Sequence, residues 1–396
     1  MSEWKKVKLK DCCIKIGSGS TPKGGSMVYV NSGTSLIRSQ NVYNLSFDYN
    51  GLTHITEEAA NKLKGVTVFN EDILLNITGD SVARTCIVPK EVLPARVNQH
   101  VAIIRTDRKK MNWRFLNYYL ASPKMQAHML SLAVGKGASR NAMTKQMIEN
   151  FEVPYPPLST QHRIASILSR YDSLIENYQK QIKLLEEAAR RLYKEWFIDL
   201  HFPGHENTKI VDGVPEGWEK KKVADVVVFY DKMRKPLSSM QRQSMEKIYP
   251  YYGAASLMDY VDNYLFDGTY LLMGEDGTVI SNEKYPMLQY VWGKFWVSNH
   301  AHVLQGKEPY STEFIYMMLK QMTILDVVTG AAQPKISQGR LAAKEIIMPA
   351  NELVKEYDKI VVPMIQQAKS LQSQIRLLTE ARERLLPKLM GGEITV

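Results

Sequence analysis

The chain has 396 residues, of which 44% are hydrophobic, and a formal net charge of +10. This length predicts two or three domains, and the composition excludes a chain that is disordered throughout. No run of about 18 apolar residues is present, so we expect no membrane span, and MSEWKKVKLK lacks the apolar core of a signal peptide. The three cysteines, Cys12, Cys13 and Cys86, lack the spacing of a disulfide framework or a metal site, so a reducing cytoplasm is the expected location.

Residues 1–158 predict a mixed α/β globule. Strand-like apolar runs occupy 72–78 and 100–106, a helical pattern occupies 113–120, and a glycine-led loop follows at 135–141. The segment carries 21 basic and 12 acidic residues, a net charge of +9. Such a surplus indicates a polyanionic partner, most often nucleic acid, although an ordinary basic surface is the alternative.

Residues 159–202 predict one long helix and a short connector. Ser159 or Thr160 can cap the helix, and Pro203 with Gly204 breaks the pattern after it. Apolar residues recur at steps of three or four, which is typical of a coiled-coil seam. The seam residues expected here are Ile164, Ile167, Tyr171, Leu174, Tyr178, Ile182, Leu185 and Leu192.

Residues 203–350 predict a second globule with the same order of elements. This segment carries 16 basic and 17 acidic residues, a net charge of −1. Its expected elements are strands at 223–230, 270–274 and 295–304, a helix at 312–319 and a glycine-led loop at 330–335.

Residues 351–396 predict the second long helix, with Asn351 as its cap. Pro363 lies inside the pattern and is expected to kink or break the helix. Pro387 and then Gly391 and Gly392 are expected to end it. The seam residues expected here are Ile360, Leu371, Ile375, Leu378 and Leu385.

The two long helices share a repeated sequence. QIKLLEEAARRLY at 181–193 returns as QIRLLTEARERLL at 374–386, with eight of thirteen positions identical. The chain is therefore a tandem duplication whose unit is one globule and one helix. The apolar stripes can cover each other if the helices pair antiparallel, which predicts an α+β fold with a pseudo-twofold repeat and two mixed α/β globules separated by a coiled coil. A generic dimerisation hairpin would not explain why the helix is repeated while the globules diverge.

We recognise no catalytic motif in the sequence. The stretch GSGSTPKGG at 17–25 lacks the Gly-Lys-Ser/Thr end of a phosphate-binding loop, and no GxGxxG follows a strand. No Asn/Asp-Pro-Pro-aromatic tetrapeptide of amino-methyltransferases is present, and Glu219-Lys-Lys221 has no preceding Pro-Asp. His201 and His205 are interpreted as a solvated linker, and His300 and His302 as alternating across a strand with one face buried, because a metal site needs further ligands. We expect neither a catalytic residue nor a metal in this chain.

At this point the sequence resembles the specificity (S) subunits of type I restriction-modification systems along essentially its whole length. The helical stretches VPYPPLSTQHRIASIL (153–168) and QIKLLEEAARRLYKEWF (181–197) and the tail RERLLPKLMGGEITV (382–396) are similar to conserved regions of that family. GSGSTP (17–22), YPYYGAAS (249–256) and GTYLLMGEDGTV (268–279) are similar to strings of its target recognition domains. Pro363 in the second helix, and Ser159-Thr160-Gln161 in place of the commoner Glu-Gln, depart from the family pattern.

The resemblance implies a division of the chain and a function. Residues 1–158 and 203–350 would be target recognition domains, each reading one half of a split, asymmetric DNA site, and 159–202 and 351–396 would be the conserved helical regions that set the spacer. Two modification (M) subunits would dock on the helices and methylate adenine N6 with S-adenosylmethionine. Two restriction (R) subunits would add ATP- and Mg-dependent translocation and cleavage, so no cofactor is expected in this chain.

Basic residues in glycine-flanked loops are the expected DNA contacts, because glycine allows the backbone to approach a phosphate closely. Ordinary solvated surface charges are the alternative for each. The expected residues are Lys23, Arg38, Arg84, Lys136 and Arg140 in the first globule and Lys232, Arg234, Lys235, Lys284 and Lys335 in the second. The pair Tyr251–Tyr252 could stack on an extruded base, but packing within a strand is favoured.

The outer helix faces offer a docking surface for the M subunit. Arg190, Arg191 and Lys194 lie there, and the aromatic residues Tyr193, Trp196 and Phe197 favour docking over a merely solvated face. A stand-alone DNA-binding regulator would instead bind its site without partners. A fragment of a single-chain restriction enzyme would carry methylase or nuclease motifs, which do not appear.

The charge asymmetry between the globules gives a first prediction. The first globule is expected to supply most of the salt-sensitive DNA affinity, because each neutralised phosphate adds about 0.9 to the slope of log affinity against log salt. Measurement of this slope for the two globules, each expressed alone, checks the prediction. Equal slopes would contradict it.

Overall fold

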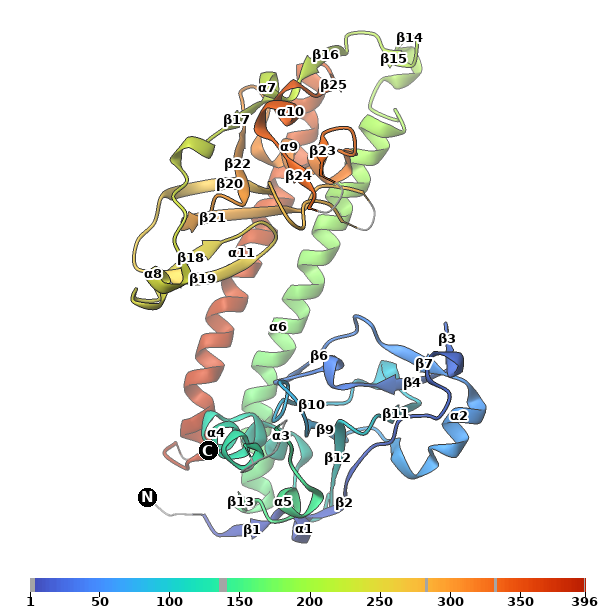
Figure 1. The fold of residues 1–396 in the computed structure, drawn as a ribbon, viewed down its shortest axis with the longest axis vertical. Helices are drawn as coiled ribbons and strands as arrows, with labels where there is room; N and C mark the ends of the chain where they lie inside the picture. The colour runs from blue at the N-terminus through green and yellow to red at the C-terminus, as the bar shows by residue number, and fades with distance from the viewer. Residues whose placement is uncertain (1–3, 135–140, 282–283, 331–332, 395) are drawn as a thin grey trace. The chain divides into compact units, whose positions relative to one another are not determined.

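The structure, a computed structural model, describes residues 4–134, 141–281, 284–330, 333–394 and 396. It divides into two compact units, one made of Met1–Asn177 with Gln374–Val396 and the other of Tyr178–Ser373. Each unit contains one mixed α/β globule and a part of both long helices (Figure 1). The division by contacts therefore cuts through the long helices, whereas the sequence suggests a division at their ends.

The two predicted long helices are present. α6 (Leu158–Tyr193) has 36 residues and continues into a single π-helical turn at Lys194–Ile198, and α11 (Asn351–Met390) has 40 residues. The first residues of α6 and α11 are equivalent positions of the sequence repeat. Both helices pass from one unit into the other without a break.

Pro363 does not divide the second helix, so the expected break is wrong. α11 runs through both Pro363 and Pro387 and ends at Met390. Proline removes the hydrogen bond to the carbonyl four residues earlier, which here belongs to Lys359. Lys359 and Pro363 are both exposed, so water can bind this carbonyl.

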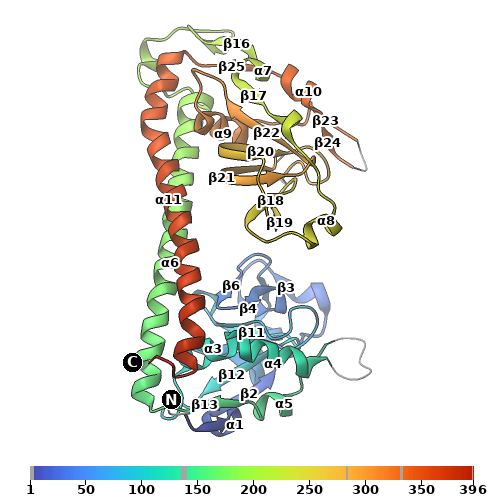
Figure 2. The same cartoon turned by 90° about the vertical axis from the view of Figure 1, so that its left-hand side faces the viewer.

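The long helices pack antiparallel within each unit. In the first unit the early part of α6 meets the late part of α11, where Arg382 Nη1 lies 2.6 Å from Asp172 Oδ1. In the second unit the late part of α6 meets the early part of α11, where the Tyr357 hydroxyl donates to the Ala189 carbonyl at 3.0 Å. Both views of each unit show the two helices side by side (Figures 1 and 2).

Each globule is built on the same four-stranded antiparallel frame. The strand order is β2-β12-β9-β10 in the first and β17-β22-β20-β21 in the second. The frame strands are β2 (Cys13–Ser18), β9 (Ile73–Asn76), β10 (Thr85–Ile87) and β12 (Val101–Thr106), and β17 (Val227–Phe229), β20 (Phe266–Gly274), β21 (Leu288–Val297) and β22 (Ala301–Gly306). This common frame confirms the tandem duplication.

The parts added to the frame differ between the globules. The first globule adds a five-stranded sheet, with strand order β3-β7-β4-β11-β8, and α2 (Glu57–Lys62). Its strands are β3 (Tyr29–Val30), β4 (Thr34–Ile37), β7 (Thr53–Ile55), β8 (Thr67–Val68) and β11 (Ala95–Val97). The second globule instead extends its frame with the hairpin β18 (Tyr249–Tyr252) and β19 (Leu257–Val261), and adds α8 (Ser239–Gln243).

Matching elements lead each frame into its long helix. β1 (Lys6–Lys8) pairs with β13 (Glu152–Pro154), and β16 (Glu219–Lys222) pairs with β25 (Glu345–Met348), so each globule returns beside its own entry strand. The remaining helices of the frames are α1 (Leu9–Cys12), α3 (Trp113–Ala121), α4 (Pro123–Ala133) and α5 (Lys145–Glu149), and α7 (Val223–Val226), α9 (Thr312–Gln321) and α10 (Gln338–Ala343).

The caps of α3 and α9 also fasten each globule to a long helix. Asn112 caps α3 with its side-chain oxygen, and its backbone N–H donates to Gln161 Oε1 of α6 at 2.8 Å. Ser311 caps α9, and its hydroxyl donates to Asp358 Oδ1 of α11 at 2.8 Å. Burial raises the pKa of Asp358 to about 6, although the hydrogen bond from Ser311 opposes the rise.

Two strand predictions need correction. The run 223–230 begins as the helical turn α7 and becomes strand β17 only at Val227, where the burial pattern changes. The run 295–304 is the end of β21 and the start of β22, separated by a turn in which Ser298 Oγ accepts from the His300 N–H at 3.2 Å. The second change of direction falls on the polar residues Ser298, Asn299 and His300.

Most of the expected seam residues are buried or half-buried, and two are exposed. Leu174 and Ile360 are 43% and 41% exposed, because the neighbouring Ile175 and Val361 occupy the inner positions instead. Adjacent apolar residues on a helix point about 100° apart, so the sequence does not decide which one faces the partner. The other expected residues are buried or half-buried, namely Ile164, Ile167, Tyr171, Tyr178, Ile182, Leu185, Leu192, Leu371, Ile375, Leu378 and Leu385.

Within the described part of the chain, no helix has the length and apolar character needed to cross a membrane.

Candidate functional site

The basic residues proposed for the first globule have different surroundings. Lys23 is exposed in the turn after β2. Arg38 is half-buried and donates to the Gly51 carbonyl at 2.6 Å and to Thr53 Oγ1 at 2.9 Å, so its guanidinium supports a loop. Arg84 stacks over the Tyr43 ring at 4.5 Å. Lys136 and Arg140 lie outside the described residues, and DNA contact by any of these residues stays a prediction.

In the second globule, two of the five proposed residues converge. Arg234 Nη1 and Lys335 Nζ lie 2.6 and 3.6 Å from the carboxylate of Glu275. Arg234 is largely buried and also donates to the Ala301 carbonyl at 2.7 Å, whereas half of the Lys335 side chain is exposed. Lys232, Lys235 and Lys284 are exposed, and the structure does not bring them into this cluster.

One cluster in the described part of the chain has the composition of a metal site. The ligand atoms of Asp231, Glu275 and His302 lie within 4.8 Å of one another. Arg234 pairs with both carboxylates, and His302 is bound through both ring nitrogens, to Asp231 at 2.5 Å and to the Ile336 carbonyl at 2.9 Å. Burial opposes ionisation of Asp231, but the hydrogen bond and charge of His302 lower its pKa below the ordinary value. The guanidinium already supplies the positive charge, so the cluster acts as an ion-pair network that anchors the loops.

The histidines of each pair differ in their exposure. His302 is fully buried in β22, whereas His300 is exposed in the turn before that strand. His201 is exposed and His205 half-buried in the turns that follow α6. The sequence interpretation missed His100, which occupies in the first globule the position of His300 in the second. The signal is the pair of tripeptides Asn98-Gln-His and Ser298-Asn-His, each placed before a frame strand.

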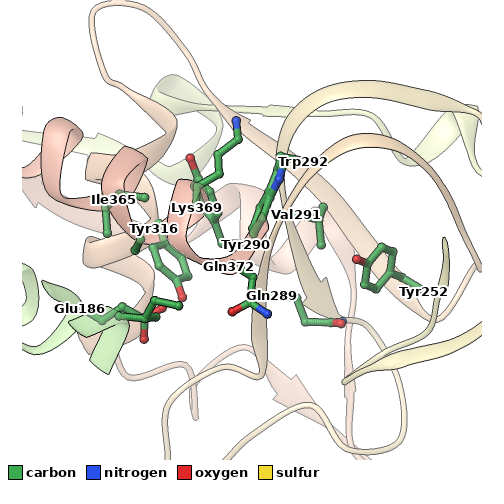
Figure 3. A pocket seen from close by; sticks show the side chains of 12 residues that line it. Glu186, Tyr252, Gln289, Tyr290, Val291, Trp292, Tyr316, Ile365, Lys369 and Gln372 are labelled. Atoms are coloured by element: carbon green, nitrogen blue, oxygen red, sulfur yellow. The ribbon is translucent and has the colours of Figure 1, made fainter. Parts of the chain in front are cut away.

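A pocket of about 330 Å³ lies in the second unit, between the frame sheet and the two long helices. Its lining includes Tyr290, Trp292, Tyr316 and Lys369 (Figure 3). Tyr252 also contributes to the lining, whereas Tyr251 is 1% exposed and packs in the sheet. This burial agrees with the packing interpretation of the tyrosine pair.

Polar contacts around this pocket fasten the second globule to α11. The Tyr290 hydroxyl and Gln366 Nε2 both bond to Glu313 Oε1, at 2.7 and 3.0 Å. Lys369 Nζ donates to Thr269 Oγ1 at 3.2 Å and lies 5.8 Å from the centre of the Trp292 ring. Because Tyr290, Glu313 and Gln366 come from β21, α9 and α11, these bonds fix the frame sheet on the helix.

The first unit uses a different polar connection. Asp172 of α6 accepts from Arg382 of α11 and from the Tyr118 hydroxyl of α3. Burial, and then the carboxylate of Asp172, raise the pKa of Tyr118, so its hydroxyl keeps the proton that it donates. The repeat-equivalent positions of Asp172 and Arg382 in the second unit are the apolar residues Ile365 and Ala189.

The outer face of each long helix carries the same exposed group. Leu184 is 68% exposed, and its repeat equivalent Leu377 is 56% exposed. The next turn of each helix holds an ion pair, Glu187–Arg191 at 2.9 Å in α6 and Glu380–Arg384 at 2.6 Å in α11. We call these two groups the outer leucine surfaces.

The aromatic residues expected to help docking are not available for it. Tyr193, Trp196 and Phe197 are at most 9% exposed and belong to the core of the second unit. Their rings lie 5.1–5.9 Å from the ring of Tyr357, on α11. Arg190 and Lys194 remain exposed, with Lys194 Nζ 2.6 Å from Asp199 Oδ1. Any docking face must therefore use other residues.

Taken together, the fold and these surfaces define a duplicated protein in which two α/β globules of one frame are each fastened to a pair of antiparallel helices. The family model of the type I restriction modification DNA specificity domain matches residues 1–187 and 215–375. The chain therefore belongs to this family of type I restriction-modification specificity subunits.

Named relatives agree with this assignment. The type I restriction enzyme MjaIX specificity subunit of Methanocaldococcus jannaschii is 25% identical over the whole of this chain and 94% of its own length. A putative specificity subunit of Haemophilus influenzae, S.HindORF215P, is 34% identical over 39% of this chain and 38% of its own. The crystal structure of the S subunit from M. genitalium shares the fold, with a TM-score of 0.60 and 17% identity over 98% of this chain and 96% of that one.

Proposed function

We propose that this chain selects the DNA site of a type I restriction-modification complex, with each globule reading one half of a bipartite, asymmetric sequence. The observation that carries the proposal is one frame with two different additions. A frame that is kept in both globules supports a common mode of binding, and additions that differ support two different half-sites. Side chains on the additions would supply base contacts, while basic residues near the frame loops would bind phosphates.

The long helices would set the distance between the half-sites. Both run through the two units without a break, and each globule is fastened to them by polar bonds. A helix of 36 residues is about 54 Å long at 1.5 Å per residue. Half-sites one DNA turn apart lie roughly 34–36 Å from centre to centre, so a helix of this length leaves room for a globule at each end of the spacer.

The outer leucine surfaces would dock two copies of one M subunit. A large apolar side chain that stays exposed in both repeats, beside the same ion pair, suits a partner that binds twice. The M subunits would supply adenine N6 methylation with S-adenosylmethionine. R subunits would supply ATP- and Mg-dependent translocation and cleavage, and this chain would contribute no catalytic group.

Mapping of methylated adenines tests the proposal. The chain would be expressed with its M subunit in a host free of adenine methylation, and the host genome would be sequenced by a single-molecule method. We expect one asymmetric motif made of two short specified parts around an unspecified spacer, with an adenine methylated in each part. A continuous motif, or no new methylation in cells that contain the assembled complex, would refute the proposal.

Substitution of both exposed leucines gives a prediction for docking. The variant Leu184→Asp/Leu377→Asp is expected to lose co-purification with the M subunit, because a charge would replace each apolar contact at the centre of the surface. Each single variant should retain about one M subunit per chain, measured by native mass spectrometry. Since both leucines are exposed, thermal stability should stay close to that of the wild type.

The matched control for docking is Leu174→Asp, which changes another exposed leucine of α6 outside the repeated group. It should leave two M subunits bound. Full binding of M by the double variant would show that docking uses another face. Binding of the wild-type chain to its site with no M subunit present would favour a stand-alone regulator.

A further inference from the structure

One loop junction is the same in both globules, although the parts added to their frames differ. In the first globule it joins the loop after β9, the turn before β12 and residues 141–143. In the second it joins the loop after β20, the turn before β22 and residues 334–336. We call each of these a histidine junction, because His100 and His300 occupy its turn.

The backbone of the two junctions matches bond for bond. The first is held by Ile77 N–H to the His100 carbonyl at 3.0 Å, Met143 N–H to the Ile77 carbonyl at 2.8 Å and Gly79 N–H to the Asn141 carbonyl at 3.0 Å. The second is held by Glu275 N–H to the His300 carbonyl at 2.8 Å, Ile336 N–H to the Glu275 carbonyl at 2.8 Å and Gly277 N–H to the Pro334 carbonyl at 3.1 Å. Gly79 and Gly277 have φ values of 74° and 77°, which glycine adopts without strain.

The histidine rings are also held in the same way. His100 Nδ1 lies 2.6 Å from Thr78 Oγ1, and His300 Nδ1 lies 2.7 Å from Asp276 Oδ1. A carboxylate only accepts, so Nδ1 of His300 is the donor, and the Thr78 hydroxyl can accept the same bond. Fixing Nδ1 leaves Nε2 as the ring atom available to a ligand.

Nε2 has different surroundings in the two junctions. The His300 side chain is 50% exposed, and no hydrogen bond to its Nε2 is recorded among the described residues. His100 is partly exposed, and its Nε2 accepts a hydrogen bond from Nε2 of the exposed Gln99 side chain at 3.3 Å, so a ligand at this atom would displace the amide. An exposed amide thus precedes the histidine in each globule, Gln99 in one and Asn299 in the other.

Positive charge adjoins each junction. Thr21 hydrogen-bonds to Gln99, and the exposed Lys23 follows two residues later. In the second globule Lys335 forms an isolated β-bridge with Asp276. The guanidinium of Arg234 lies 3.3 Å from the Asn299 carbonyl. The first junction therefore has an exposed cation nearby, whereas Arg234 and Lys335 at the second are paired with the carboxylate of Glu275.

A feature common to both globules should bind what the two half-sites have in common. The proposed half-sites differ in base sequence, but they share the sugar–phosphate backbone. We propose that His100 and His300 each contact a phosphate of the DNA through Nε2, and so position their globule on the duplex without reading its sequence. A phosphate beside Nε2 favours the doubly protonated ring, which donates from both nitrogens. This inference rests on the proposed function.

Binding measurements on full-length variants test the histidines. Each of His100→Gln and His300→Gln is expected to weaken binding to a 40-base-pair duplex of mixed sequence by roughly five- to tenfold, and to lower the salt slope by about 0.9. The loss should be the same on the methylated motif as on mixed sequence. The control is His201→Gln, which removes an exposed histidine outside both junctions and should leave the affinity unchanged.

A measurement on the unmodified chain covers the case in which a variant does not fold. Diethyl pyrocarbonate labels accessible histidine nitrogens, and peptide mass spectrometry identifies the labelled residues. In the wild-type complex with its M subunit, a saturating concentration of duplex should protect His100 and His300 from labelling, while His201 stays reactive.

The outcomes separate this inference from the proposed function. If the complex methylates a bipartite motif, but the variants bind mixed duplex as tightly as the wild type or both histidines stay reactive, the inference is wrong and the function stands. Protection by the M subunit without DNA would also overturn it, because the junction would then be a protein contact. A wild-type complex that binds no duplex at all would overturn the proposed function and this inference together.

Discussion

Replacement of Arg382 by alanine is expected to destabilise the unit made of 1–177 and 374–396 by about 3 kcal/mol. The guanidinium is 14% exposed and the carboxylate of Asp172 is 22% exposed, so the substitution strands a charge that water reaches poorly. The Tyr118 hydroxyl would remain as its hydrogen-bond donor, but would not neutralise it. Chemical denaturation of the full chain, followed by circular dichroism, measures the change.

The repeat itself supplies the matched control for this prediction. In the second unit the equivalent positions are Ile365 and Ala189, both buried. The variant Asp172→Ile/Arg382→Ala/Tyr118→Phe places the same apolar pair in the first unit and removes the hydroxyl that would lose its acceptor. It should recover most of the lost stability, because apolar replacement of a buried ion pair is often close to neutral. A triple variant no more stable than Arg382→Ala would show that the pair contributes through more than charge neutralisation.

Lengthening both long helices together is expected to lengthen the spacer of the recognised DNA. Four residues inserted after Gln179 of α6 and four after Gln372 of α11, its repeat equivalent, add about 6 Å and close to one full turn to each helix. The added length corresponds to roughly two base pairs, so methylation should move to a motif with the same half-sites and a spacer longer by one or two base pairs. Single-molecule sequencing of methylated adenines reads the result.

Two control insertions distinguish length from general damage. The same residues placed at the Asp212–Gly213 turn, in the hairpin of β14 (Ile210–Val211) and β15 (Val214–Pro215), should leave the spacer unchanged. An insertion in α6 alone should abolish methylation, because it shifts one apolar face against the other. Methylation at the original spacing in the double-insertion variant would exclude the helices as the element that sets the distance.

The long-range architecture follows from the sequence because it depends on repetition and periodicity. The repeat of QIKLLEEAARRLY predicted two equivalent helices, and regular apolar steps located them within a few residues. Choices between neighbours were less certain: Ile360 and Val361 are equally apolar, and only the packing shows that Val361 faces inward. Pro363 appeared to be a break because the sequence does not say that it lies on the exposed face.

The added sheet and the surfaces were harder to predict for a physical reason. Strands of two or three residues, such as Tyr29–Val30 and Thr67–Val68, have no readable alternation, and β11 pairs in parallel with the distant β4. Arg234 was predicted to contact DNA because of its charge. In the structure it pairs with Glu275, which lies 41 positions away in the sequence. Tyr193, Trp196 and Phe197 appeared as surplus apolar surface because their cover, Tyr357, comes from the other repeat.

The first unit combines two segments that are far apart in the sequence, which affects how the chain folds during synthesis. Residues 374–396 complete a unit that begins at the N-terminus, and Leu386 and Leu389 join the core that contains Ile164 and Leu168. During synthesis, that apolar stripe of α6 lacks its cover until residues 374–396 have emerged. A chain without residues 374–396 would therefore expose this apolar face of α6, which favours aggregation.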